Sequence, residues 1–309
     1  MTVAFRAARK SAQFITSEVK MLKWLFGANQ SARAAEEIPV ERPAALAISP
    51  ASYLSPGLAV VENWDWPSPD EIRGSLLSND CGDVWRRIPN GHKWLNYFDS
   101  YEALFSRFRG KAPRVLEIGV DRGGSLVLWQ KYFGADSQIV GIDINPDCAA
   151  FNDPANGVHV RIGSQDDPKF LGAVVDEFGP FDIIIDDGSH VVSHQIASFN
   201  ALFDRGVKTG GIYMVEDLET SYWGKRSGQA DLPVTFIDFA RSVLDLMHQP
   251  YVDHDYMTFR IEATPGTSLK VPRIAKLVDQ IRFFDSIAAF YRTDRLPPVV
   301  EYLFEAPQA

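Results

Sequence analysis

The sequence contains only two cysteines, Cys81 and Cys148, which are too few for a disulfide framework and indicate a reducing compartment. No run of apolar residues approaches the length of about 18 that a membrane-spanning helix needs. Basic residues are in deficit: 31 Lys and Arg stand against 40 Asp and Glu, a formal charge of −9. A nucleic-acid-binding protein normally has a basic excess, so we exclude that class and expect a cytoplasmic protein.

The 309 residues, 46% of them apolar, suggest two domains or one large domain with an appendage. A chain of this length can bury about three quarters of its unfolded surface without a stabilising disulfide or metal. Its charge is uneven, because residues 1–26 carry a net +4 and the remaining 283 residues sum to −13. The sequence therefore has a basic head and an acidic body.

The basic head is predicted to form an amphipathic helix, because Ile15, Val19, Leu22 and Phe26 recur at helical spacing. Such a helix could dock on a neighbouring subunit or on the chain's own core. It could instead lie on a membrane surface, since its polar face is basic. A cleaved signal peptide is disfavoured, because lysines interrupt the apolar stretch.

Composition divides the chain into three parts. Residues 1–60 are predicted to hold the amphipathic helix and a Pro- and Ala-rich linker. Residues 61–110 are predicted to form a helical lid or cap, with a helix over 95–108. Residues 111–309 have the pattern of an α/β domain.

Short apolar runs in this last part predict strands. They are Val115–Ile118, Gln138–Ile142, Val158–Ile162, Asp182–Ile185 and Ile212–Val215. Runs without alternation suit strands that are covered on both faces, so we predict a doubly wound, mainly parallel, Rossmann-like sheet. Helices are expected after Ser189 and over Phe236–Met247, and Ile281–Phe284 with Ile287–Tyr291 predicts a terminal antiparallel pair.

A glycine turn follows the first of these strands, in the segment Val115–Gly124. This geometry lets the backbone approach a nucleotide-like ligand. The dinucleotide fingerprint G-x-G-x-x-G fails, because Gly119 and Gly124 fit but Asp121 occupies the middle glycine position. A diphosphate would be repelled by this carboxylate, which disfavours a nicotinamide oxidoreductase. An acidic residue here suits a ligand with a positive end, such as the amino group of a methionine moiety.

The ends of the next two strands carry further polar groups. Asp143 lies 26 residues after Glu117, close to where a carboxylate binds ribose hydroxyls in doubly wound folds. One strand later, the turn Gly163-Ser-Gln-Asp166 is placed to contact an adenine edge.

Two acidic pairs end neighbouring predicted strands: Asp186 with Asp187, and Glu216 with Asp217. Parallel strands would bring both pairs to the same carboxyl edge, where such sheets bind ligands. Four carboxylates there would repel one another unless a cation intervened, and hard oxygen ligands favour Mg²⁺ or a similar ion. The alternative is that these are ordinary cap or loop acids.

These residues resemble the class I S-adenosylmethionine-dependent methyltransferases, over roughly residues 90–292. The blocks Phe181-Asp-Ile-Ile-Ile-Asp-Asp-Gly-Ser-His190 and Gly210–Trp223, with His194 between them, look like the metal-dependent sugar O-methyltransferases that act on macrolide and related glycosides. The resemblance makes 111–309 the methyltransferase domain.

The resemblance implies an O-methyltransferase that uses S-adenosylmethionine and a divalent cation on a glycoside hydroxyl. It implies metal ligands at Asp187, Glu216 and Asp217, with His190 as the general base. The candidate cofactor residues are Glu117, Gly119, Asp121, Gly123, Asp143, Ser164, Gln165, Asp166 and Asp186. His190 could instead cap a helix, and a zinc pair of His190 with His194 is discounted because no third soft ligand is evident.

Upstream of the glycine turn, the sequence departs from the family pattern. Asn90-Gly-His-Lys93 and Tyr97 stand where the family has a Gly-Thr-Asp-Lys-like block and paired histidines, so Lys93 and Tyr97 remain but the histidines do not. This leaves the acceptor open, and a non-sugar diol such as a catechol is an alternative to a sugar. A non-catalytic S-adenosylmethionine-binding accessory protein is the other alternative, which the intact acidic quartet with His190 disfavours. Tyr222 and Trp223 could form an aromatic wall for the acceptor or could be packing residues. We expect a homo-oligomer and a peripheral membrane contact through residues 1–26.

Overall fold

A computed structural model describes residues 58, 63–76, 78–222, 235–252, 259–260, 266 and 268–301. The chain divides into two compact units, Met1–Ser68 and Pro69–Ala309, and every element described below belongs to the second. The helix expected within residues 1–26 lies outside the described residues, as does Trp223. Cys81 and Cys148 are free thiols and are buried.

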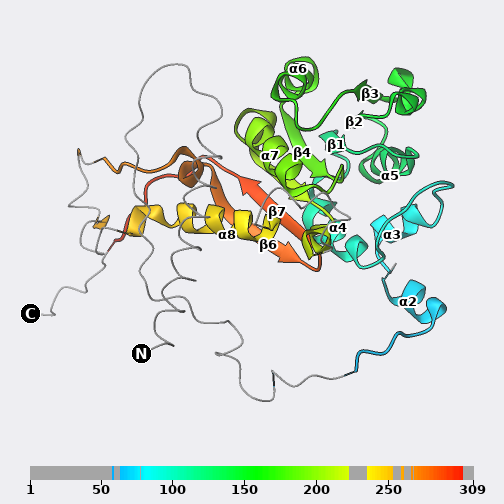
Figure 1. Ribbon diagram of the computed structural model, residues 1–309, viewed down its shortest axis with the longest axis horizontal. Coiled ribbons are helices and arrows are strands. Elements are labelled where there is room, and N and C mark those ends of the chain that lie inside the picture. Colours follow the sequence, from blue (N-terminus) through cyan, green and yellow to red (C-terminus); the bar gives the residue numbers. More distant parts are fainter. Residues whose placement is uncertain are drawn as a thin grey trace, which may run out of the picture. The chain divides into compact units, whose positions relative to one another are not determined.

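Within the described residues, seven strands form one sheet in the order β3-β2-β1-β4-β5-β7-β6 (Figure 1). Their bounds are β1 Arg114–Ile118, β2 Gln138–Asp143, β3 Val158–Ile162, β4 Phe181–Asp186, β5 Val207–Val215, β6 Val278–Phe284 and β7 Ile287–Arg292. Strands β1 to β5 pair in parallel, while β7 pairs antiparallel with both β5 and β6. The predicted doubly wound, mainly parallel sheet with a terminal antiparallel pair is confirmed.

Helices cover both faces of this sheet. Their bounds are α2 Pro69–Leu76, α3 Asp80–Trp85, α4 Tyr97–Phe105, α5 Gly124–Phe133, α6 Pro168–Phe178, α7 Val192–Gly206 and α8 Phe236–Met247. None of the helices in the described part of the chain combines the length and apolarity needed to cross a membrane.

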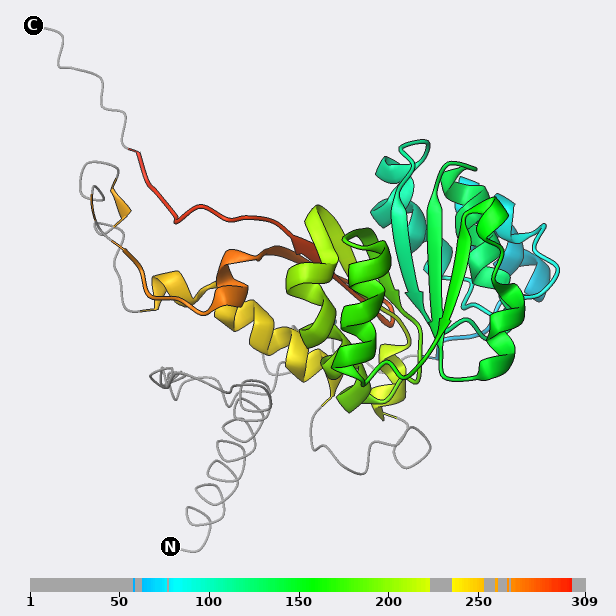
Figure 2. The same cartoon turned by 90° about the horizontal axis from the view of Figure 1, so that it is seen from above.

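Alternate residues of the buried strands supply two separate core layers. On one face, Val115 and Ile183 belong to a cluster with aromatic residues of α4 and α5, including Tyr101 and Trp129. On the other face, rings of α7 and α8 pack against β5 and β7; Phe199, for example, lies 5.1 Å from Tyr213, centroid to centroid. Figure 2 shows the same layering from above, with the orange and red β6–β7 hairpin beside the yellow helix α8.

The strand register brings the ends of the parallel strands together. Ile118 at the end of β1 is level with Ile142 on β2 and with Asp186 on β4, and Asp186 is level with Val215 on β5. The chain leaves β1 towards β2 and β3 and then returns to β4 on its other side, so β1 and β4 flank a topological switch point. Ligands of open α/β sheets bind at such a point.

Some element bounds differ from those predicted. Strand β5 begins at Val207, earlier than the start predicted at Ile212. The predicted start was later because Gly210 and Gly211 have a low strand propensity. The helix expected over 95–108 is shorter, because α4 ends at Phe105 and a 3-10 turn follows. Strands β2 and β3 are joined by 3-10 turns rather than by an α-helix.

Candidate functional site

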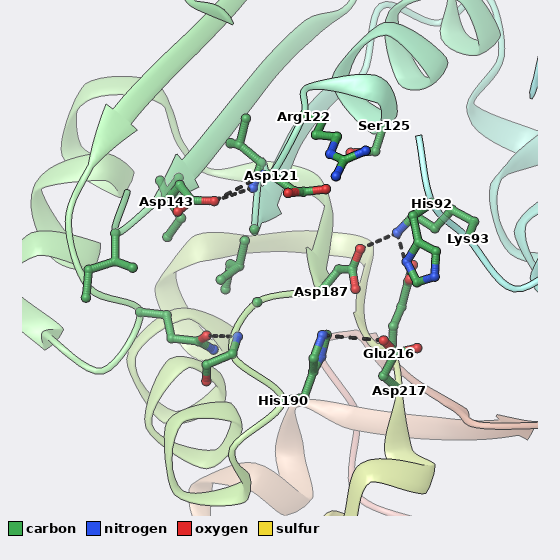
Figure 3. Close-up of a pocket in the computed structure, with 18 of the residues that line it drawn as sticks. His92, Lys93, Asp121, Arg122, Ser125, Asp143, Asp187, His190, Glu216 and Asp217 are labelled. Atoms are coloured by element: carbon green, nitrogen blue, oxygen red, sulfur yellow. Dashed lines mark hydrogen bonds and ion pairs between the residues drawn. The ribbon is translucent and has the colours of Figure 1, made fainter. Parts of the chain in front are cut away.

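A pocket of about 380 Å³ lies at the switch point, beyond the carboxyl ends of β1, β2, β4 and β5 (Figure 3). Its walls come from the loops after these four strands, from the turn after β3 and from residues 91–97, which precede and begin α4. The candidate residues that line it are Gly119, Asp121, Asp143, Ser164, Gln165, Asp187, His190, Glu216 and Asp217. Residues separated by more than 120 positions in the sequence therefore share one cavity.

The glycine turn after β1 packs too closely against its neighbours to accept side chains. A Cβ on Gly119, whose φ is +96°, would lie 2.1 Å from the carbonyl oxygen of Asp187. A Cβ on Gly124 would lie 1.7 Å from the carbonyl oxygen of Asn90. The glycine turn is therefore packed closely against the loop after β4 on one side and against the segment before α4 on the other.

Asp143 supports this turn from the end of β2. Its Oδ2 accepts hydrogen bonds from the backbone N–H of Val120 at 2.8 Å and of Asp121 at 3.2 Å, and its Oδ1 accepts from Asn145 at 2.8 Å. Partial burial opposes ionisation, but these backbone donors outweigh it and hold the pKa of Asp143 below its ordinary value. The carboxylate is thus ionised and oriented at the pocket wall.

The turn after β3 also faces the pocket in part. Ser164 and Gln165 line it, and the Gln165 amide accepts from the backbone of Ser189 at 2.6 Å and donates to Asp186 at 3.1 Å. Asp166 does not line the pocket; it accepts a hydrogen bond from the Ser164 hydroxyl.

Three other candidate cofactor residues, Glu117, Gly123 and Asp186, do not line the pocket and lie behind its wall. Glu117 is fully buried and accepts from the indole of Trp129 at 3.1 Å, and burial raises its pKa to about 7 although Lys93 opposes this rise. Gly123 is also outside the lining, and a Cβ there would meet the ring of Phe151 at 2.6 Å. Neither residue presents a side-chain atom to the cavity.

Asp186, the third of these, is embedded between the sheet and α7. Its carboxylate accepts from Ser198 at 2.6 Å, Tyr213 at 3.1 Å and Gln165. Burial raises its pKa to about 6, against the opposing effect of these donors. Since it is fully buried and does not line the pocket, its position is that of a buried hydrogen-bond acceptor.

The remaining acids form what we call the acidic cluster: Asp187, Glu216 and Asp217 (Figure 3). The ammonium of Lys93 makes an ion pair with Asp187 and a second one with Glu216 at 2.8 Å. Burial alone would lower the pKa of Lys93, but the two carboxylates raise it well above its ordinary value. The acidic cluster is therefore in contact with a buried positive charge, the ammonium of Lys93.

Two tyrosines of α4 complete the contacts of the acidic cluster. Tyr97 donates to Asp217 at 2.6 Å, and Tyr101 donates to Glu216 at 2.8 Å. Tyr97 was expected from the family pattern, whereas Tyr101 was not among the candidates and lies within the helix expected over 95–108. The spacing of four residues between two tyrosines is the signal that could have paired them on one helix face.

His190 faces the same cluster. Its Nε2 lies 3.4 Å from a carboxylate oxygen of Asp217, and its Nδ1 is buried without a hydrogen-bond partner among the described residues. One ligand atom from each of Asp187, His190 and Asp217 can be chosen so that all lie within 4.8 Å of one another. His190 does not cap α7, whose N-cap residue is Val191. His194 contacts Ser189 and lies 3.7 Å from Asp166.

The β6–β7 turn holds the loop that follows Asp217. The hydroxyl of Ser286 accepts from the backbone of Glu219 at 3.0 Å and donates to its carboxylate, and the carbonyl of Ser286 accepts from Leu218 at 3.1 Å. Both Asp217 and Ser286 have left-handed backbones, with φ of 55° and 62°. The antiparallel hairpin is therefore tied to Leu218 and Glu219, the two residues that follow Asp217.

No protein-family profile matches the chain. The chain is 38% identical over 185 residues to an 8-demethyl-8-(2-methoxy-alpha-L-rhamnosyl)-tetracenomycin-C 3'-O-methyltransferase of Streptomyces olivaceus, covering 57% of this chain and 45% of that protein. It is 39% identical over 172 residues to a mycinamicin VI 2''-O-methyltransferase of Micromonospora griseorubida, covering 50% and 41% respectively.

Among solved structures, the chain is similar to the MycE methyltransferase from the mycinamycin biosynthetic pathway in complex with Mg, SAH and mycinamycin VI, with a TM-score of 0.60 and 26% identity. The match covers 75% of this chain and 57% of that one. The chain thus spans about half the length of the curated relatives it matches. These findings confirm the resemblance to sugar O-methyltransferases and the fold.

Proposed function

From this similarity to glycoside O-methyltransferases, we propose that the protein transfers a methyl group from S-adenosylmethionine to a hydroxyl of a sugar or glycosylated metabolite, with the help of a divalent cation. The observation that carries the proposal is the convergence of the glycine turn, the acidic cluster and His190 on one pocket. No group at this site is required to act as an acid on the leaving group, because methyl transfer releases a neutral sulfide.

The cofactor is assigned to the half of the pocket formed by β1, β2 and β3. Asp121 lies where it can meet the amino group of the methionine moiety, and Asp143 lies where it can accept from ribose hydroxyls. Ser164 and Gln165 lie at the end of β3, where an adenine edge is expected. Glu117 and Asp186 support this half from behind the wall rather than through direct contact.

The site fits a divalent cation, because Asp187 and Asp217 offer hard oxygen donors that lie, with a nitrogen of His190, within 4.8 Å of one another, and Glu216 lines the same pocket wall. We assign the ion to Asp187, Glu216 and Asp217, with Mg²⁺ as the expected species. When bound, it would supply Lewis-acid stabilisation of the negative charge that develops on the acceptor oxygen.

His190 is the proposed general base. A neutral imidazole can take the hydroxyl proton at neutral pH, and the nearby carboxylate of Asp217, 3.4 Å from Nε2, stabilises the imidazolium that results. The left-handed backbone of His190, with φ of 57°, directs the ring towards the acidic cluster rather than along α7 (Figure 3).

Calorimetric titration of S-adenosylmethionine with and without Mg²⁺ tests the first half of the proposal. Binding is expected in both conditions, and absence of any binding would refute the proposal. A panel of rhamnosides, other glycosides and catechols then tests the acceptor class. Methyl transfer to catechols alone would replace the glycoside by a non-sugar diol, and EDTA is expected to abolish transfer.

His190→Gln tests the base. We expect kcat to fall about 100-fold or more, with an unchanged affinity for S-adenosylmethionine. His248→Gln, at an exposed position after α8, is the matched control and should retain the wild-type rate. A His190→Gln variant with wild-type kcat would contradict the assignment.

The proposal includes a homo-oligomer, a peripheral membrane contact through residues 1–26 and a cytoplasmic location. Light scattering of the purified chain and flotation with anionic vesicles test the first two. A monomer, or a chain that stays unbound at low salt, would rule out the corresponding part.

A further inference from the structure

Lys93 is a buried cation inside a group of acids. Its side chain is 4% exposed, and its ammonium contacts Asp187 and Glu216, of which Glu216 is completely buried. Exposed ion pairs contribute little to stability, but removing one partner of a buried pair leaves an uncompensated buried charge. The contacts of Lys93 therefore belong to the second, energetically important kind.

The same carboxylates are the ones assigned to the divalent ion. Asp187 offers an oxygen to Lys93 and also belongs to the group of side chains that could hold a metal. Lys93 therefore places a positive charge against two of the carboxyl groups that a divalent cation would use, and its removal would leave both without this counter-charge.

We propose that Lys93 is a positioning residue that holds the acidic cluster together before metal binds and lowers its affinity for divalent cations. The inference rests on the proposed function, because it takes the acidic cluster as the metal site. A positive charge at contact distance from Asp187 repels an incoming cation, and it also compensates Glu216 when no cation is present. Lys93 thus makes the metal-free fold stable at the cost of weaker metal binding.

Lys93→Met tests this inference by removing the charge while keeping an unbranched apolar side chain. We expect a lower Tm for the metal-free variant than for the metal-free wild type, and a Kd for Mg²⁺ lower by about tenfold or more in calorimetric titration. Lys93→Arg keeps the charge and should give a Kd close to that of the wild type. Lys131→Met, at an exposed position on α5, is the matched control and should change neither quantity.

An equal or higher Kd for Mg²⁺ in Lys93→Met would overturn the inference, as would absence of Mg²⁺ binding in both proteins. If the metal-free variant is unfolded, addition of Mg²⁺ should restore its circular dichroism spectrum, and no recovery at saturating Mg²⁺ would also overturn it. Failure of the proposed function is distinguishable: a wild type that binds Mg²⁺ but transfers no methyl group refutes that function, while the comparison of Kd values still decides the role of Lys93.

Discussion

Glu117 at the end of β1 allows a stability prediction with a defined sign. Its pKa rises from 4.5 to about 7 on folding because the carboxyl group is buried. The folded protein therefore binds more protons than the unfolded chain between these values, so stability falls as the pH rises from about 4.5 to 7. At pH 8 the ionised Glu117 destabilises the fold by about 3 kcal/mol.

Glu117→Gln should remove this cost, since the amide resembles the protonated acid and its oxygen can still accept from Trp129. A buried amide N–H without a partner costs about 1 kcal/mol, which leaves a net gain of about 2 kcal/mol at pH 8 and a net loss of about 1 kcal/mol at pH 4.5. Urea unfolding of the metal-free protein, followed by tryptophan fluorescence at both pH values, measures the difference. The exposed Glu301→Gln is the control.

A Glu117→Gln variant whose free energy of unfolding changes with pH as steeply as that of the wild type would refute the reasoning. The same substitution also tests how far Glu117 contributes to the half of the pocket that is assigned to the cofactor. Because Glu117 does not line the cavity, its loss should affect cofactor binding only through the packing of the glycine turn.

Asp186→Asn should lower the free energy of unfolding by about 2 kcal/mol or more, since its amide N–H would replace an oxygen that accepts either from Gln165 or from Ser198 and Tyr213; an unchanged urea midpoint would contradict this. Ser286→Ala should raise the Kd for Mg²⁺ about threefold or more in calorimetry by loosening the loop after Asp217, and equal Kd values would argue against the tie. Gly124→Ala should lower Tm by several degrees, because its Cβ would overlap the Asn90 carbonyl oxygen, and a wild-type melting curve would show that the two segments can separate.

The strands and the edge that carries the site could be predicted because the signals are local. Each buried strand is a short apolar run, and a polar residue follows it where the chain leaves the sheet. Parallel pairing then brings Asp143, Asp187 and Glu216 to one edge without further information. This is why these three acids could be named as candidates before their contacts were known.

The orientation of individual acids could not be predicted in the same way. Asp186 and Asp187 are adjacent, but alternation along β4 buries the first with Ser198 and Tyr213 and turns the second into the pocket. The sequence alone does not say which of two neighbours faces which side at the last position of a strand. The spacing of Tyr97 and Tyr101 places both on one face of α4, but which acid each of them contacts depends on the long-range packing of α4.

The position of α4 and of the segment before it determines where the α/β domain must begin along the chain. A fragment beginning at residue 111 would contain every strand, yet it would lack Lys93, Tyr97 and Tyr101. Glu216 would then be left inside the protein with neither its cation nor its phenol donor. The strands therefore depend on residues before β1, because Lys93 and Tyr101 supply the partners of the buried Glu216. An insertion or recombination between residues 93 and 114 would have to keep these residues in contact with Glu216.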